Sequence, residues 1–258
     1  MYRNERFQFS GKHYPYIINV FIPEQPVPNN GFSVLYILDG NAYGTLFSEM
    51  IKLQSRRSEK TGIEPMLLVS IEYEGGEPFH SNRVYDFTPP AAELELPARP
   101  DGSSWPEHGG AEKFMDFLEA ELIPFIDKKY KTNQQKQTIF GHSLGGLFVL
   151  YTLFQRSRLF SHYFACSPSI WWNKQAILPY ETNINDKYVK GLFIAAEPVE
   201  NKQMYANGLA MYENLSEYNK DLKTAFFAPE GENHMSIVPA AFSRGMRFLM
   251  DKIQKESL

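Results

Sequence analysis

One six-residue stretch of the chain could supply a serine nucleophile. Residues 141–146 read Gly-His-Ser-Leu-Gly-Gly, which places Ser143 in the pattern Gly-x-Ser-x-Gly. The apolar run at 137–140 predicts a buried strand, and the run at 147–151 continues as a helix that is apolar nearly all round. Glycines in such a tight strand-to-helix turn give the backbone room while the serine Oγ stands free above the sheet. Ser143 is therefore a candidate nucleophile; the alternative is a glycine-rich turn whose serine has no role.

A serine needs a general base, and His234 is the histidine placed to be one. It lies in the Gly- and Asn-containing loop 229–234, after the last predicted strand and before the last predicted helix. It would take the Ser143 proton during attack and return it to the leaving alcohol. A surface-loop histidine is the alternative. His142 is expected to fill space or to hydrogen-bond locally, and the spacing of the histidines suggests no metal site. No cofactor is expected.

The acid that would orient His234 is left open between two glutamates. Glu197 and Glu200 both follow the predicted strand at 192–196, where a carboxylate could accept the second ring N–H of the histidine. A Ser-His dyad without an acid is the third possibility.

Acyl transfer also needs two N–H donors for the oxyanion that develops on the substrate. The backbone of Leu144, the residue after the nucleophile, supplies one. Asn41 in the loop Asp39-Gly40-Asn41 is expected to supply the other, with the glycine permitting close approach. A plain turn is the alternative for this loop, because all three residues favour turns.

The elements that must position these groups alternate along the chain. Apolar runs predict strands at 32–38, 65–71, 137–140, 163–166, 192–196 and 224–228. Helical spacing predicts helices at 46–53, 114–125, 201–218 and 238–253. Residues 6–22 alternate loosely and predict an antiparallel hairpin. The order predicts one α/β domain over residues 1–258, with a mostly parallel central sheet and helices on both of its faces.

A Pro- and Gly-rich stretch interrupts this alternation at about residues 72–110. A loop of this length inside a compact domain is usually functional or disordered. Because it lies between a strand and a helix, it should emerge over one end of the sheet, and we expect it to cover the substrate.

Bulk composition narrows the function classes. The net charge of −4 gives no basic footprint, so nucleic acid is not an expected partner. No run approaches 18 apolar residues, so no membrane partner is expected, and a cytoplasmic protein is the simplest interpretation. The single cysteine, Cys166, excludes an internal disulfide and a Cys-based zinc cluster.

Several stretches resemble the putative esterase family of α/β-hydrolases, and within it the trilactone siderophore esterases that open enterobactin, salmochelin or bacillibactin. The matching stretches are 34–42, the Arg-x-Tyr-Asp-Phe-Thr-Pro segment at 83–89, 109–124, 141–150, 167–169 and 231–234. The resemblance implies an α/β-hydrolase fold, Ser143 as nucleophile, His234 as base and Arg83 as a contact for an anionic substrate. The segment around Glu197 and Glu200 departs from the common hydrolase pattern, which leaves the acid open.

The chemistry of such a substrate predicts which side chains should bind it. A ferric tris-catecholate is a bulky, aromatic trianion, so it requires a wide cleft, aromatic surfaces and local cations. The expected substrate-binding residues are Arg83, Tyr85, Trp171 and Trp172. An arginine fork can bind oxygen-rich anions and stack on rings. The alternative is that Arg83 pairs with Asp86 to brace the loop while the tryptophans pack in the core.

Together these observations predict a serine esterase that opens catecholate trilactones through an acyl-enzyme at Ser143, with iron present only as part of the substrate. Two alternatives stay open. The chain could be a carboxylesterase or thioesterase of the same family acting on S-formylglutathione, feruloyl or acetyl esters. It could also be a binding module on an inactive hydrolase scaffold.

Overall fold

The computed structural model of the chain describes residues 2–11, 14–99, 102–184, 188–198 and 202–251. Its strands are β1 (Tyr2–Ser10), β2 (Pro15–Pro23), β3 (Phe32–Ile37), β4 (Met66–Tyr73), β5 (Thr132–His142), β6 (His162–Cys166), β7 (Gly191–Ala195) and β8 (Thr224–Phe227). They form a sheet in the order β1-β2-β4-β3-β5-β6-β7-β8. The pairs β1–β2 and β2–β4 are antiparallel, and the remaining pairs are parallel. The expected mostly parallel sheet with an antiparallel hairpin at its start is confirmed.

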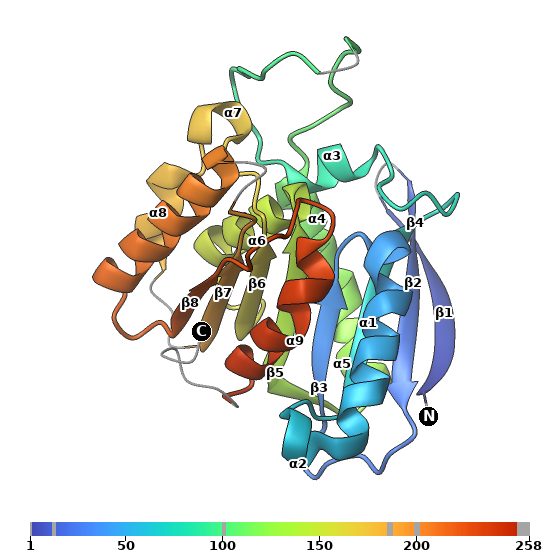
Figure 1. Cartoon of the computed structure of the whole chain (residues 1–258). Coiled ribbons are helices and arrows are strands. Elements are labelled where there is room, and N and C mark those ends of the chain that lie inside the picture. The colour runs from blue at the N-terminus through green and yellow to red at the C-terminus, as the bar shows by residue number, and fades with distance from the viewer. Residues whose placement is uncertain (1, 12–13, 100–101, 185–187, 199–201, 252–258) are drawn as a thin grey trace.

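Helices cover both faces of this sheet. They are α1 (Gly40–Gln54), α2 (Ser58–Thr61), α3 (Arg83–Phe87), α4 (Ala111–Phe117), α5 (Ile123–Lys129), α6 (Leu144–Gln155), α7 (Trp172–Gln175), α8 (Lys202–Tyr218) and α9 (Ile237–Leu249). Short 3₁₀ turns lie at Ser55–Arg57 and Leu178–Asn183, and a π-helical turn at Leu118–Leu122 joins α4 to α5. In Figure 1, α1 and α9 lie on the near face of the sheet and α4, α5 and α6 on the far face.

The two faces carry separate apolar cores because side chains alternate along each strand. In β3, Val34 and Tyr36 pack in the core beneath α6, whereas Leu35 and Ile37 pack in the core beneath α1 and α9. All four are essentially inaccessible to solvent. A near-continuous apolar run is therefore what a strand covered on both faces requires, as the sequence predicts.

The structure differs from the sequence-based expectations at two helices. Helix α1 begins at Gly40 rather than at residue 46, because Asp39 takes a left-handed conformation (φ 51°, ψ 46°) that turns the chain straight into the helix. The stretch 72–110 contains the short helix α3, where no periodic element was expected. The described part of this stretch that follows α3 rises toward α7, at the end of the sheet where the parallel strands terminate (Figure 1).

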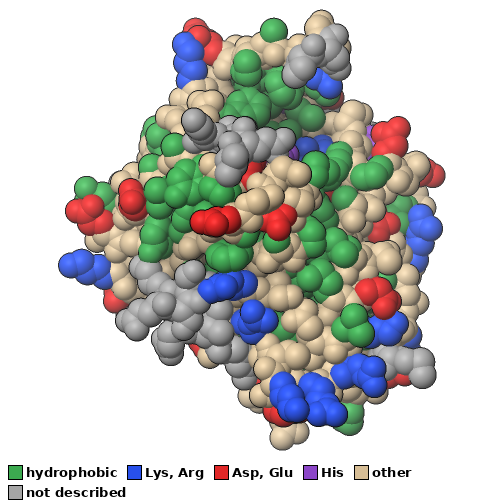
Figure 2. Space-filling model, viewed as in Figure 1, with side chains coloured by type: hydrophobic (Ala, Val, Ile, Leu, Met, Phe, Trp, Pro, Cys, Tyr) green, Lys and Arg blue, Asp and Glu red, His purple; other side chains and the backbone are tan. Residues whose placement is uncertain are grey.

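The charged surface has no single sign. On the face drawn in Figure 2, acidic and basic side chains are interspersed, and Lys and Arg side chains gather at the end of the molecule that carries α2, away from α7. Among the helices in the described ranges, none has the length and apolar character needed to cross a bilayer.

Candidate active site

Ser143 lies at a sharp turn between β5 and α6, as the sequence predicts. Its backbone takes φ 59° and ψ −116°, a region that non-glycine residues rarely adopt. The flanking glycines are required by close packing. A Cβ on Gly141 would lie 2.2 Å from the Gly145 carbonyl oxygen, and one on Gly146 would lie 2.9 Å from the Cys166 carbonyl oxygen. The turn therefore holds the Ser143 side chain at the carboxyl end of the sheet.

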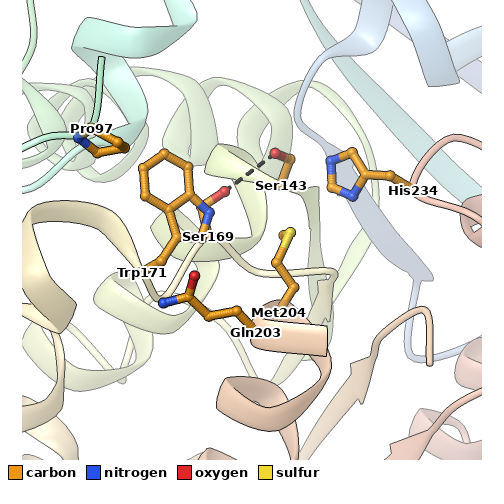
Figure 3. Close-up of a pocket in the computed structure, with 7 residues that line it drawn as sticks. All are labelled: Pro97, Ser143, Ser169, Trp171, Gln203, Met204 and His234. Atoms are coloured by element: carbon orange, nitrogen blue, oxygen red, sulfur yellow. Dashed lines mark hydrogen bonds between the residues drawn. The ribbon is translucent and has the colours of Figure 1, made fainter. Parts of the chain in front are cut away.

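Ser143 and His234 line one pocket. The pocket has a volume of about 440 Å³ and is lined by Pro97, Ser143, Ser169, Trp171, Gln203, Met204 and His234. Figure 3 shows the His234 imidazole facing the Ser143 side chain from one side, with Trp171 and Pro97 on the other. The Ser143 Oγ lies 3.3 Å from the Ser169 Oγ. Two loops far apart in sequence thus bring the candidate nucleophile and the candidate base together.

Glu197 contacts the other side of the His234 ring. Its Oε1 lies 2.9 Å from His234 Nδ1, and its Oε2 accepts a hydrogen bond from the Ser167 hydroxyl. Burial of this carboxyl group raises its pKa, but the hydrogen bonds from His234 and Ser167 outweigh that effect and hold the pKa below its ordinary value. An ionised Glu197 can only accept, so Nδ1 must carry the proton and Nε2 is left as the acceptor that a general base needs. Glu200, the other candidate acid, lies outside the described residues.

His142 packs against His234 but does not line the pocket. Its ring centroid lies 4.4 Å from that of His234, and its Nδ1 lies 2.8 Å from the Tyr43 hydroxyl oxygen. Burial, followed by the nearby charges of His234 and Arg83, holds the pKa of His142 well below its ordinary value. His142 is therefore neutral and hydrogen-bonds locally, as expected from the sequence.

Two helix N-termini meet beside Ser143. Strands β3 and β5 are neighbours, so α1 and α6 start at the same edge of the sheet. A Cβ on Gly145 would lie 3.4 Å from the Asp39 carboxylate, which shows how closely the two starts approach. The N–H groups of Asn41 and Leu144 belong to first helical turns, whose N–H groups have no partner within the helix. The Asn41 side chain fixes this turn through two hydrogen bonds to the backbone of Tyr73. Its Nδ2 donates to the Tyr73 carbonyl oxygen at 3.0 Å, and its Oδ1 accepts from the Tyr73 N–H at 2.8 Å.

Arg83 is placed differently from both sequence-based expectations. Its Nε and Nη2 donate to the two carboxylate oxygens of Asp39 at 2.7 and 2.8 Å, and Nη2 also donates to the His142 carbonyl oxygen at 3.2 Å. The alternative, a pairing of Arg83 with Asp86, is wrong, because that carboxylate instead accepts hydrogen bonds from Tyr16 and Tyr73. The Arg83 side chain is buried and is not part of the lining of the Ser143 pocket. Arg83 is the first residue of helix α3, all five residues of which are buried.

The three expected aromatic contacts divide between pocket and core. Trp171 lines the Ser143 pocket. Trp172 is 2% exposed and packs edge-on against Trp105, with ring centroids 5.2 Å apart. Tyr85 is also buried and its hydroxyl accepts a hydrogen bond from Lys113 at 2.6 Å, in a separate cavity. The structure therefore places one of these three rings, Trp171, beside the candidate nucleophile.

Four pocket residues were not singled out from the sequence: Pro97, Ser169, Gln203 and Met204. Gln203 and Met204 lie in the first turn of α8, which follows Glu197 in the chain. Only the order of the elements could have predicted them, because residues that follow a parallel strand gather at the carboxyl end of the sheet.

The short turn α7 holds the long loop against the pocket. Asn173, Lys174 and Gln175 are left-handed, with φ of 44°, 51° and 63°. The Asn173 side chain accepts from the Glu95 N–H at 2.8 Å and donates to the Glu93 carbonyl oxygen at 3.2 Å. These bonds fix the loop two residues before Pro97, which reaches the pocket.

Within the described ranges, no three His, Cys, Asp or Glu side chains are grouped so that they could bind a metal ion.

Comparisons with known proteins agree with this geometry. The family model described as putative esterase matches residues 14–232. The ferri-bacillibactin esterase BesA of Bacillus subtilis is 42% identical, over 91% of this chain and 84% of that protein. The siderophore enterobactin esterase of Emericella nidulans is 31% identical, over 84% of this chain and 82% of that protein. The crystal structure of the BES protein from Bacillus cereus superposes with a TM-score of 0.90 at 41% identity, covering 95% of both chains.

Proposed function

The chain belongs to the putative esterase family, and from this premise we propose that it hydrolyses the ester bonds of catecholate trilactone siderophores through an acyl-enzyme at Ser143. The observation that carries the proposal is that Ser143 and His234 line one pocket, while the buried Glu197 binds the other side of the His234 ring. Such an arrangement makes a serine hydroxyl nucleophilic.

The chemistry follows from the roles that the geometry supports. His234 Nε2 takes the proton of Ser143 Oγ as that oxygen attacks an ester carbonyl carbon of the trilactone. The carbonyl oxygen becomes an oxyanion, to which the N–H groups of Leu144 and Asn41 donate. The intermediate then collapses: the bond to the leaving alkoxide breaks, and His234 gives that oxygen the proton. Water repeats the sequence on the acyl-enzyme and regenerates Ser143, while Glu197 stabilises the imidazolium in both halves.

The substrate class is supported by the relatives and by the pocket. Two relatives that match most of the chain are described as esterases of ferri-bacillibactin and of enterobactin. Trp171 offers a ring face beside Ser143, on which an aromatic acyl group could stack. We further propose that the loop bound by Asn173 covers the substrate, and that the reaction takes place in the cytoplasm, where iron enters the site only as part of the substrate.

Rates on a substrate panel test this function. Purified protein is offered ferric bacillibactin, ferric enterobactin, the iron-free trilactones and short p-nitrophenyl esters, with Ser143→Ala as the control. The proposal expects kcat/KM to favour the trilactones and expects Ser143→Ala to abolish hydrolysis. A strong preference for the short esters would contradict the assigned substrate but would leave the serine mechanism intact.

A further inference from the structure

We propose that Arg83 is a positioning residue that holds the two backbone donors of the oxyanion hole in register, and that it does not contact the substrate. The inference rests on the proposed function, because it assigns the oxyanion hole to the N–H groups of Asn41 and Leu144.

The contacts of Arg83 join the two loops that carry these donors. One fork of the guanidinium binds both carboxylate oxygens of Asp39, at 2.7 and 2.8 Å. Its Nη2 also reaches the His142 carbonyl oxygen, at 3.2 Å. Asp39 precedes Asn41 by two residues, and His142 precedes Leu144 by two residues. The side chain thus connects the turn after β3 with the last residue of β5, each two residues before a proposed donor.

Asp39 transmits this constraint to the start of α1. Its backbone is left-handed, and its carbonyl oxygen accepts hydrogen bonds from Ala42 N at 2.9 Å and Tyr43 N at 3.1 Å. The residue therefore closes the first turn of the helix that contains the Asn41 N–H. A shift of its carboxylate would move that turn relative to Ser143. Displacements of about 1 Å in a catalytic group can cost about 10²-fold in rate.

The surroundings of Arg83 favour a fixed structural charge over a substrate contact. The side chain is 11% exposed, and the guanidinium carbon lies 5.4 Å from the Phe79 ring centroid and 5.5 Å from that of Phe87. Asp39 neutralises its charge at hydrogen-bond distance. Arg83 therefore offers no unpaired cation to an anionic ligand in the Ser143 pocket, which it does not line.

The chemistry of the contacts also calls for arginine in particular. Two parallel N–H donors meet the two carboxylate oxygens, and one of those nitrogens serves the backbone carbonyl as well. A lysine ammonium is a compact point charge on a flexible stem, so it can pair with Asp39 without fixing both loops.

The test separates kcat from KM on two esters of different charge. Arg83→Lys and the double variant Arg83→Met with Asp39→Asn are compared with the wild type on neutral p-nitrophenyl acetate and on anionic ferric enterobactin. The double variant removes both buried charges together, so no unpaired carboxylate is left to disturb folding. Thermal unfolding checks each variant, and Arg83→Lys, which keeps a cation opposite Asp39, gives the answer if the double variant does not fold.

The matched control is Arg156→Met. This arginine also binds two carboxylates, those of Asp116 and Glu119 at 2.6 and 2.9 Å, but it lies just beyond the far end of α6. Its kcat on both esters should stay within about twofold of the wild type, as usual for a surface ion pair.

A positioning role predicts that kcat falls by about 10²-fold on both esters in the double variant, while KM changes little. Arg83→Lys should recover only part of this loss. The proposal is overturned if kcat is kept and KM rises for ferric enterobactin alone, since that result would make Arg83 a substrate contact. It is also overturned if the folded variants keep wild-type kcat on both esters.

Failure of the proposed function would look different. If Ser143→Ala retained wild-type activity on the same two esters, the serine mechanism would be wrong, whatever the Arg83 variants did. If the wild type hydrolysed the short ester but not the trilactone, only the assigned substrate would be wrong, and the short-ester kcat would still test Arg83.

Discussion

Glu197 Oε1 lies 2.9 Å from His234 Nδ1, and the glutamate side chain is completely buried. Strand β7 ends at Ala195, so Glu197 follows its carboxyl end by two residues. The adjacent strand β6 ends just before Ser167, whose hydroxyl binds the second carboxylate oxygen. The carboxylate is thus fixed from two sides, which lets it orient the imidazole toward Ser143.

Replacing the Glu197 carboxylate should therefore lower kcat strongly. In Glu197→Gln the amide can present an N–H to Nδ1, which favours the wrong imidazole tautomer. We expect kcat to fall by about 10³-fold or more, by analogy with the loss of the acid in other triads. Steady-state kinetics on a trilactone measure the effect. Glu200→Gln is the comparison variant, and a larger loss there than in Glu197→Gln would show that the wrong glutamate has been assigned.

The hydrogen bonds of Asn173 to the long loop at 72–110 can be tested by substitution. Asn173→Gly removes the amide that binds Glu93 and Glu95, while glycine tolerates the left-handed backbone without strain. Each lost hydrogen bond contributes about 1 kcal/mol. Two such bonds are lost, so KM for a ferric trilactone should rise by up to about 30-fold, with kcat on p-nitrophenyl acetate unchanged. Equal KM values for the trilactone in variant and wild type would rule out a role for this contact in covering the substrate.

The packing of the nucleophile turn makes a prediction about stability. In Gly141→Ala the new methyl group would lie 2.2 Å from a backbone oxygen that cannot move without distorting α6. We expect a loss of about 3 kcal/mol in the free energy of unfolding and loss of Ser143 labelling by a fluorophosphonate. Gly208→Ala in α8 is the control. There the methyl group would meet Phe226 at 3.4 Å, so a gain of up to about 1 kcal/mol from helix propensity is expected. Denaturant unfolding distinguishes the two outcomes.

The buried His162, which lies away from the active site, should make the free energy of unfolding depend on pH. Burial, followed by the charge of Lys190, lowers its pKa to about 4 from the ordinary 6.5, while the nearby Asp251 opposes the shift. The unfolded chain therefore binds the proton more readily than the folded chain between these two pH values, so falling pH destabilises the fold. The contribution is complete above about pH 6.5 and is lost by about pH 4.

His162→Gln should abolish this pH dependence. Relative to the variant, the wild type should lose up to about 3 kcal/mol of stability between pH 6.5 and pH 4. Urea unfolding at several pH values measures the difference. Parallel curves for the two proteins over this range would show that His162 takes up its proton equally well in the folded and unfolded chains.

Local sequence patterns were sufficient for the fold and for the nucleophile turn. The strand at 137–140 and the apolar helix after it are short-range signals, and the glycines around Ser143 have a role that close backbone packing requires. The start of α1 was missed because the left-handed turn at Asp39 and the residue Asn41 after it are both held by distant contacts. The Asn41 side chain binds the backbone of Tyr73, and no periodicity records such a bond.

The partners of charged groups were harder to predict, because burial decides them. Arg83 and Asp86 are three residues apart, the spacing of neighbours on a helix, yet Arg83 pairs with Asp39, 44 residues away. The choice between Glu197 and Glu200 was likewise open, since both follow the same predicted strand. The hydrogen bond from His234 to Glu197 depends on how β6, β7 and β8 are ordered in the sheet.

Mass spectrometry of the protein during turnover can detect the acyl-enzyme at Ser143 itself. Opening a trilactone leaves the alcohol attached to the same molecule, so the first acyl-enzyme should carry the whole mass of the substrate. After rapid acid quenching, the account predicts this added mass on the peptide that contains Ser143, and neither adduct nor product with Ser143→Ala. Trilactone hydrolysis that continues in Ser143→Ala, with no adduct in the wild type, would contradict it.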